Sequence, residues 1–140
     1  MLRGFTTVSY YAEDLEAAKA WYTELLGVEP YFEVPGGYAE FRIGDYQHEL
    51  GLIQGDYAKH DLGAVPGGEI IFWHVDDLDA TLERLKSMGA TEYEPKIERG
   101  PGFTTASVID PFGNILGVMY NQHYLDVLSE LAGSGPKSAK

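Results

Sequence analysis

The chain has 140 residues, of which 44% are hydrophobic, and it carries a formal net charge of −12 and no cysteine. A chain of this length forms one domain or two small half-domains and buries a core without disulfide bonds. The missing cysteine excludes disulfides, thiolate nucleophiles and cysteine-bound zinc. The negative charge argues against a nucleic-acid partner, because phosphates are bound by Lys and Arg.

The N-terminal residues lack the basic start, apolar run and cleavage site of a signal peptide. No apolar run in the sequence approaches the ~20 residues that span a bilayer. We therefore expect a cytoplasmic protein with no membrane partner.

The first half of the chain reads as one helix among four strands. Asp14 is the expected N-cap of a helix that Gly27 ends, with an apolar face at helical spacing. A strand-like run precedes this helix and three follow it, separated by turns rich in glycine and proline. The expected strands are residues 5–11, 29–34, 38–43 and 48–54.

The second half repeats this order. A helix is expected between Asp77 and Gly89, with leucines and a methionine on its apolar face. The expected strands are residues 69–75, 91–97, 104–109 and 115–121. Both helices start with nearly the same text, "DLEA" at Asp14 and "DLDA" at Asp77, 63 residues apart. This spacing indicates an internal repeat.

The repeat predicts an α+β fold made of two tandem βαβββ modules, at about residues 4–54 and 69–121. The sheets of the two modules are expected to pair into a cup-shaped cleft. We assign both modules to one domain, residues 1–124, joined by a loop at residues 55–68. Residues 125–140 complete a short helix at about 124–131 and then form a tail that is expected to be disordered from Gly133.

Three motifs carry a family resemblance: "AEDLEAAKAWYTELLG" at Ala12–Gly27, "VDDLDATLERLKSMGA" at Val75–Ala90 and "DPFGNILGVMY" at Asp110–Tyr120. Together they resemble the vicinal oxygen chelate superfamily. This group includes glyoxalase I, extradiol dioxygenases, fosfomycin-resistance enzymes and bleomycin-resistance proteins. The resemblance extends to about Tyr120 and implies a fold, but it does not imply one reaction.

The resemblance also implies four positions for metal ligands, one on each of four strands that line the cup. In metal-dependent relatives, His or Glu side chains at these positions hold a divalent ion that acts as a Lewis acid. The first and third positions lie seven residues before Asp14 and Asp77, and are Thr7 and Ile70. Thr7 is a weak ligand, and the Ile70 side chain cannot coordinate a metal.

The second position is His48, and the fourth, seven residues after Asp110, is Gly117. Only His48 is therefore a good ligand, and an ion held by one imidazole exchanges freely. The sequence thus predicts no metal cofactor. A divalent metal stays open as the alternative if His48 joins Glu69 or His74, with Glu49, through an irregular strand at residues 69–75.

The expected cup has a mostly apolar floor with a few polar points, which is typical of small-molecule pockets. His48 is also a candidate general base in a reaction without metal. The candidate pocket residues are Thr7, Ser9, Tyr11, His48, Ile70, Phe72, His74, Phe103 and Gly117.

These observations favour a small-molecule binding protein of the glyoxalase/bleomycin-resistance type, with a degenerate metal site and a ligand- or drug-sequestering role. The alternative is a divalent-metal-dependent lyase, isomerase or dioxygenase with His48 as one ligand. The sequence does not decide whether the protein is an enzyme. A small organic ligand is the expected partner, and a cationic or aromatic one suits the charge and the ten tyrosines. The resemblance also implies a homodimer.

Overall fold

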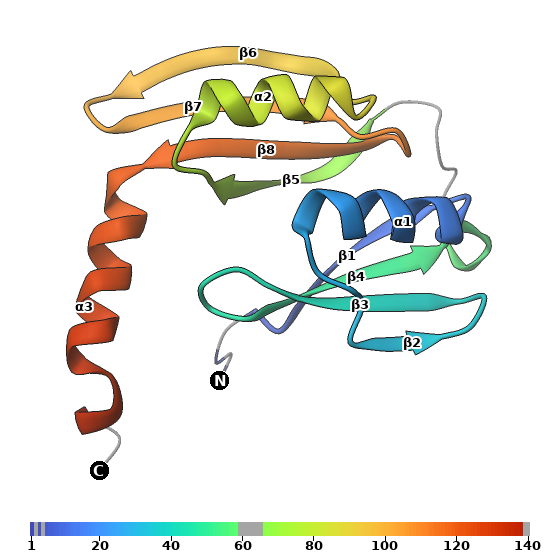
Figure 1. Cartoon of the computed structure of the whole chain (residues 1–140), viewed down its shortest axis with the longest axis horizontal. Helices are drawn as coiled ribbons and strands as arrows, with labels where there is room; N and C mark the ends of the chain where they lie inside the picture. The colour runs from blue at the N-terminus through green and yellow to red at the C-terminus, as the bar shows by residue number, and fades with distance from the viewer. Residues whose placement is uncertain (2, 4, 59–65, 139–140) are drawn as a thin grey trace. The chain divides into compact units, whose positions relative to one another are not determined.

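A computed structural model describes residues 1, 3, 5–58 and 66–138, with side chains left undescribed at 67–69 and 134–138. The chain divides into two compact units, Met1–Gly68 with Asp110–Asn114, and Glu69–Ile109 with Ile115–Lys140. Each unit combines a four-stranded sheet with helices, which confirms the predicted α+β fold of two βαβββ modules (Figure 1). Within the described ranges, no helix is long and apolar enough to cross a bilayer.

The first unit holds a sheet of order β1-β4-β3-β2, in which β1 and β4 are parallel and the other neighbours are antiparallel. The connection from β1 to β2 is the helix α1, which packs on β3 and β4. A short 3-10 turn, η1 (Gly55–Tyr57), follows the last strand. The elements are β1 (Thr7–Ala12), α1 (Leu15–Leu26), β2 (Phe32–Val34), β3 (Tyr38–Ile43) and β4 (His48–Gln54).

The second unit repeats the order as β5-β8-β7-β6, with β6, β7 and β8 antiparallel to their neighbours along the chain. The helix α2 connects β5 to β6, and α3 continues from the end of β8 and extends away from the sheet (Figure 1). The elements are β5 (Gly67–His74), α2 (Leu78–Ser87), β6 (Thr91–Gly100), β7 (Phe103–Ile109), β8 (Asn114–Asn121) and α3 (Gln122–Ser138).

The repeated "DL" text starts both repeat helices in the same way. Asp14 accepts a hydrogen bond from the backbone N–H of Ala17 at 3.0 Å, and Asp77 accepts one from that of Ala80 at 3.0 Å. An N-cap carboxylate satisfies a free N–H group of the first turn and interacts favourably with the helix dipole. Gly27 ends α1 with a φ of 72°, a left-handed conformation that favours glycine.

Each sheet buries one face against its helix. In the first unit, Phe41, Leu50 and Leu52 are fully buried together with Tyr22 of α1. In the second unit, Leu78 and Leu85 of α2 are buried. The buried residues that share one face of β7 and β8 are Ala106, Val108, Leu116 and Val118.

Half of the strand limits agree with the prediction and the others differ by one to three residues, whereas the helix α3 differs more. The sequence predicts a helix at about 124–131, whereas α3 runs from Gln122 to Ser138. The disorder expected from Gly133 stays a prediction, and residues 139 and 140 lie outside the described range. The helical spacing of Tyr124, Leu128 and Leu131 agrees with the part of α3 that precedes Gly133.

Candidate functional site

The strand β1 separates its side chains onto two faces. Tyr10 and Ala12 are buried, whereas Thr7 and Ser9 are exposed and Tyr11 is half-buried. Parallel pairing aligns Thr7 with Glu49, and Ser9 with Gly51, so these side chains share a face. We call this face, which is opposite to the buried leucines of β4, the outer face of the first sheet. It comprises Thr7, Ser9, Tyr11, Phe32, Val34, Tyr38, Glu40, Arg42, Glu49, Gly51 and Ile53.

His48 does not lie on this outer face. It alternates with Glu49 along β4 and so projects on the same side as Leu50 and Leu52, which are buried. His48 itself is exposed at the end of the strand, where its ring stacks on Tyr46 at a centroid distance of 5.5 Å. His48 therefore projects from the sheet face opposite to Thr7 and Ser9, and its role in ligand binding stays a prediction.

A carboxylate pair lies at the centre of the outer face. Glu40 on β3 is only 8% exposed and accepts a hydrogen bond from the hydroxyl of Tyr38 at 2.5 Å. Its carboxyl group also interacts with the carboxyl group of Glu49 on the neighbouring strand β4. The pair therefore places a buried carboxyl group beside a second one.

The second carboxylate of the pair has partners of its own. Glu49 accepts a hydrogen bond from the Tyr31 hydroxyl at 3.2 Å, and the Arg42 guanidinium lies 3.8 Å from its other oxygen. The same guanidinium lies over the ring of Tyr31, 4.9 Å from the centroid. Arg42 therefore balances the charge of Glu49 at one end of the site, next to the aromatic ring.

Burial and neighbouring charge shift two groups of this network. Burial raises the pKa of Glu40 above its ordinary value, and the hydrogen bond to Glu49 raises it further, against the opposing effect of Arg42. Burial and the charge of Glu49 also raise the pKa of Tyr38, although a hydrogen bond with Ser9 acts in the opposite direction. Both shifts favour the neutral form of the group.

Gly51 makes room for this network. A β-carbon built on Gly51 would lie 2.5 Å from the hydroxyl oxygen of Tyr38 and 2.8 Å from Oγ of Ser9. The Tyr38 side chain therefore lies directly on the glycine backbone, and its hydroxyl is held between Ser9 and Glu40. A residue with a side chain at position 51 would displace Tyr38 from Glu40.

We expect Gly51→Ala to lower the free energy of unfolding by about 1–3 kcal/mol, because overpacking forces neighbouring side chains to move. Urea denaturation measures this loss. The matched variant Gly133→Ala has open space around its new methyl group and serves as the control. An unchanged midpoint for Gly51→Ala would show that Tyr38 is not held in this position.

The second sheet has its own outer face, opposite to α2. Ile70, Phe72 and Phe103 are exposed hydrophobic residues there, and Gly117 provides the space under Phe72. A β-carbon built on Gly117 would lie 2.5 Å from a ring carbon of Phe72. These four predicted pocket residues therefore lie on one sheet face, while their role in ligand binding stays a prediction.

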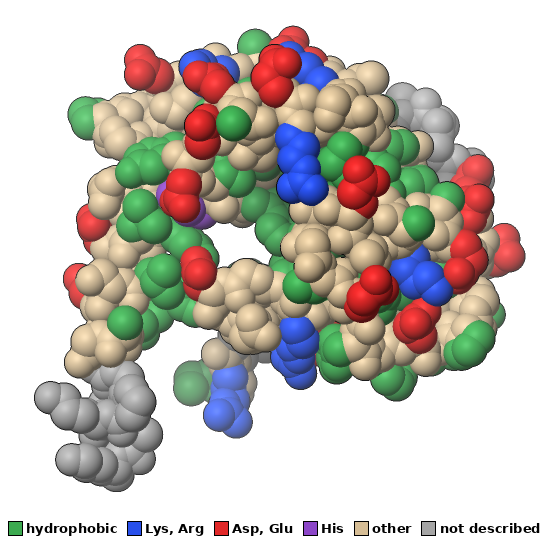
Figure 2. All heavy atoms as spheres, viewed as in Figure 1, with side chains coloured by type: hydrophobic (Ala, Val, Ile, Leu, Met, Phe, Trp, Pro, Cys, Tyr) green, Lys and Arg blue, Asp and Glu red, His purple; other side chains and the backbone are tan. Residues whose placement is uncertain are grey.

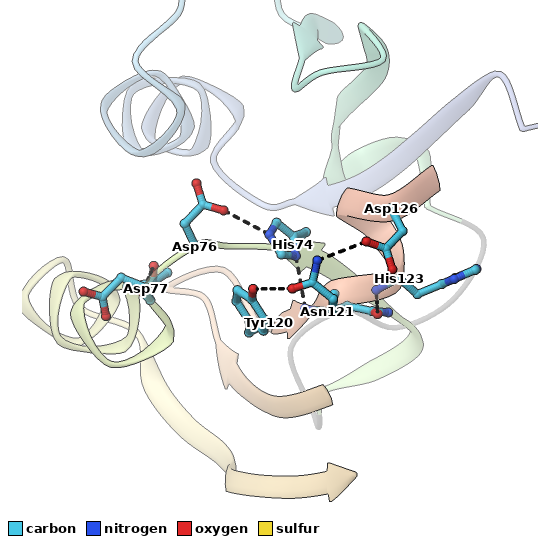
Figure 3. Close-up of polar contacts among 9 residues, drawn as sticks. His74, Asp76, Asp77, Tyr120, Asn121, His123 and Asp126 are labelled. Carbon is cyan, nitrogen blue, oxygen red and sulfur yellow. Dashed lines mark hydrogen bonds and ion pairs between the residues drawn. The ribbon is translucent and has the colours of Figure 1, made fainter. Parts of the chain in front are cut away.

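His74 lies at the end of this sheet, in a network that leaves neither ring nitrogen free (Figure 3). Its Nδ1 accepts the backbone N–H of Asn121 at 3.1 Å, so its Nε2 carries the proton and faces Asp76 at 3.1 Å. The ring stacks on Tyr124 of α3 at 4.8 Å with an interplanar angle of 7°. This geometry makes His74 a link between β5, β8 and α3. The side chain of Glu69, the other candidate ligand of this strand, lies outside the described residues.

The sequence profile of the Glyoxalase/Bleomycin resistance protein/Dioxygenase superfamily matches residues 4–118. The chain belongs to this superfamily. This finding confirms the resemblance of the three sequence motifs, and it agrees with the repeated module of the fold. No curated protein compared with the chain matches it.

Solved structures of other superfamily members are similar to the fold. A lactoylglutathione lyase from Agrobacterium tumefaciens is 24% identical over 89% of this chain and 98% of its own, with a TM-score of 0.67. A glyoxalase-related enzyme from Fulvimarina pelagi is 21% identical over 86% of this chain and 90% of its own, with a TM-score of 0.68. The fosfomycin resistance protein FosX from Listeria monocytogenes, solved with Mn(II), is 15% identical over 86% of this chain and 92% of its own, with a TM-score of 0.70.

The described residues at the expected ligand positions do not fit a divalent metal. Of the four expected ligand positions, Thr7, Ile70 and Gly117 offer one hydroxyl oxygen and no imidazole or carboxylate. His48 projects from the other face of its strand, and both ring nitrogens of His74 are already hydrogen-bonded. Among the described residues, no group of three or more His, Asp or Glu side chains could hold an ion.

Sequence reasoning missed the residues at the centre of the outer face, although a signal for them was present. The strand Tyr38–Ile43 alternates polar and apolar side chains, which marks Glu40 and Arg42 as neighbours on one face. The alternation of His48-Glu-Leu-Gly-Leu52 likewise places Glu49, and not His48, opposite to the leucines. The burial of Glu40 depends on Tyr38 and Glu49 together, and therefore required the pairing of β3 with β4.

Proposed function

We propose that this superfamily member binds and sequesters a small organic molecule that carries a positive charge, on the outer face of the first sheet and without a metal. The observation that carries the proposal is the buried carboxyl group of Glu40 on the same sheet face as Glu49. Two neighbouring carboxyl groups repel one another when both are ionised, so a bound cation stabilises their ionised form.

The surroundings of the pair suit an organic cation more than a metal ion. The rings of Tyr38 and Phe32 lie 6.4 Å apart between centroids, and Tyr31 contacts Glu49 directly. Aromatic faces attract ammonium groups, and they also bury the apolar part of such a ligand. A half-apolar face with a few convergent polar groups is the general form of a small-molecule site.

The overall charge supports the same ligand class. Asp and Glu side chains outnumber Lys and Arg, 22 against 10, and acidic groups are spread over the face shown in Figure 2. An acidic field raises the local concentration of cations near a protein and speeds their association. It would repel anionic substrates from the same surface.

We expect benzylammonium to bind the wild-type protein better than benzyl alcohol, and its affinity to rise as the pH rises above the ordinary glutamate pKa of about 4.3. The sign follows from the raised pKa of Glu40, because the cation prefers the ionised pair and binding therefore releases a proton. Glu40→Gln should weaken benzylammonium binding about tenfold and remove the pH dependence. Isothermal titration in buffers of different ionisation enthalpy measures both effects.

Glu83→Gln is the matched control, because it removes one exposed carboxylate from α2 and should leave the affinity unchanged. Equal affinity for benzylammonium and benzyl alcohol, with no response to Glu40→Gln, would contradict the proposal. Stabilisation of the wild-type protein by Mn(II), Ni(II) or Zn(II) that is lost in His48→Ala would instead favour the metal-dependent lyase, isomerase or dioxygenase.

A further inference from the structure

The second sheet buries a serine hydroxyl group on its outer face. The hydroxyl group of Ser107, on β7, is fully buried and has no hydrogen-bond partner among the described residues. A buried hydroxyl without a partner is destabilising, and most such groups in proteins are paired. The neighbouring hydroxyl of Thr105, on the same face of the strand, accepts a hydrogen bond from Arg99 at 3.1 Å.

The Ser107 side chain lies beside the glycine of the outer face. Ser107 pairs with Gly117 across β7 and β8, so both side-chain positions project from the same face, with β-carbons separated by ~5 Å in such pairs. The ring of Phe72 occupies the space above Gly117, where a β-carbon would lie 2.5, 2.8 and 2.9 Å from three ring carbons. The ring therefore covers the bare backbone of Gly117 next to the unpaired hydroxyl.

Covering a glycine explains the position of Phe72 but leaves the hydroxyl unexplained. An aromatic ring packed on a strand glycine buries apolar surface and shields the backbone. An alanine at position 107 would serve this packing equally well and would bury no polar atom. An unsatisfied hydroxyl group lies next to an aromatic ring that can be replaced. This arrangement indicates a binding place for a ligand that supplies both a hydrogen-bond partner and an aromatic ring.

We propose that a flat aromatic molecule with one hydrogen-bonding substituent, such as a phenol, displaces the Phe72 ring from Gly117 and hydrogen-bonds to Ser107. The ligand ring takes the place of the Phe72 ring on the glycine backbone, and its hydroxyl pairs with the Ser107 hydroxyl. The exposed side chains of Ile70 and Phe103 extend the apolar surface on the same face.

The Phe72 side chain is able to make this movement. It is 38% exposed, so part of the ring already faces solvent, and rotation about its side-chain bonds would move the ring off Gly117. Exposed side chains change rotamer within picoseconds to nanoseconds. Phe72 therefore acts as an internal occupant that competes with the ligand, and the affinity that is measured includes the cost of displacing it. The site lies within the second unit and involves no residue of the Glu40 network.

The test compares phenol with toluene, which has the same shape but cannot form the hydrogen bond. We expect phenol to bind the wild-type protein about fivefold more tightly than toluene, since one hydrogen bond is worth about that factor. Ser107→Ala should abolish this difference while raising the melting temperature of the free protein, because it removes an unsatisfied hydroxyl. Saturation-transfer NMR titrations and thermal unfolding measure the two effects.

Phe72→Ala distinguishes a ring that must leave before the ligand binds from a ring that stays and contacts the bound ligand. We expect this variant to bind phenol several-fold more tightly than the wild type, because no internal ring has to leave. If the ring instead contacts the bound ligand, Phe72→Ala would weaken phenol binding. Gly117→Ala should abolish phenol binding, because its methyl group fills the space that the ligand ring requires.

Ser87→Ala is the matched control, since its hydroxyl bonds the carbonyl of Arg84 on α2 and should not affect either probe. Unchanged selectivity for phenol in Ser107→Ala, or weaker phenol binding in Phe72→Ala, would overturn the inference. Both probes are uncharged, so the result is independent of cation binding by Glu40, and either proposal can fail without the other.

Discussion

Asp110→Ala is expected to lower the free energy of unfolding by about 3–5 kcal/mol, because it removes the acceptor of several buried or half-buried donors. Asp110 is buried, and its Oδ2 accepts the hydroxyl of Tyr22 at 2.6 Å. Its Oδ1 accepts the backbone N–H groups of Phe112 at 2.9 Å and Asn114 at 2.8 Å. An alanine would leave these three donors without a partner. Urea denaturation gives the change in free energy.

Tyr22→Phe separates the two roles of Asp110. It removes only the buried hydroxyl, so it should cost about 1–2 kcal/mol and leave the turn intact. The double variant Asp110→Ala/Tyr22→Phe should then be less destabilised than the sum of the single variants, because each removes the same hydrogen bond. Additive effects would show that Tyr22 and Asp110 do not interact in solution.

The pKa of Tyr22 adds a dependence on pH to the same contact. Burial raises this pKa well above its ordinary value, and the nearby Asp110 carboxyl group raises it further. The folded state therefore favours the neutral phenol, and the stabilisation is complete below the ordinary tyrosine pKa of about 10. It is lost as the pH rises above that value, so Tyr22→Phe should flatten the alkaline decline in stability.

The turn at Asp110 illustrates how far the sequence predicts this fold. The text Asp110-Pro-Phe-Gly-Asn114 identifies a turn between two strands, and the structure confirms it. The contact with Tyr22 joins residues 88 positions apart, so no local pattern reports it. The residues of the turn therefore predict the turn itself. The contribution of Asp110 to stability depends on Tyr22, which only the folded chain brings close.

The same distinction separates the predicted helices from the predicted site. Asp14, Asp77 and Gly27 act on their own helix ends, and each has the predicted role. The site depends on neighbours across strands: Glu40 is buried only because β3 pairs with β4 and Tyr38 covers Gly51. Counting positions along a family motif grouped His48 with Thr7, although the alternation of β4 places Glu49, and not His48, on the sheet face of Thr7.

His74 shows the converse case, in which a residue proposed for chemistry has a structural environment. Its side chain is only 7% exposed, and it contacts a backbone N–H, a carboxylate and an aromatic ring (Figure 3). The sequence offered no sign of this environment, because Asn121 and Tyr124 lie nearly fifty residues away along the chain.

We expect His74→Ala to lower the free energy of unfolding by about 2–4 kcal/mol, because it leaves a cavity beside Tyr124 and a backbone N–H without its acceptor. His74→Asn keeps an acceptor near the position of Nδ1 and should be less destabilising. Asp76→Asn changes only an exposed partner and should cost less than about 0.5 kcal/mol. Amide hydrogen exchange at Asn121 reports the bond directly, and it should accelerate in His74→Ala but not in Asp76→Asn. Amide exchange at Asn121 that is equally slow in all variants would show that His74 does not anchor α3. His74 would then again be a candidate metal ligand.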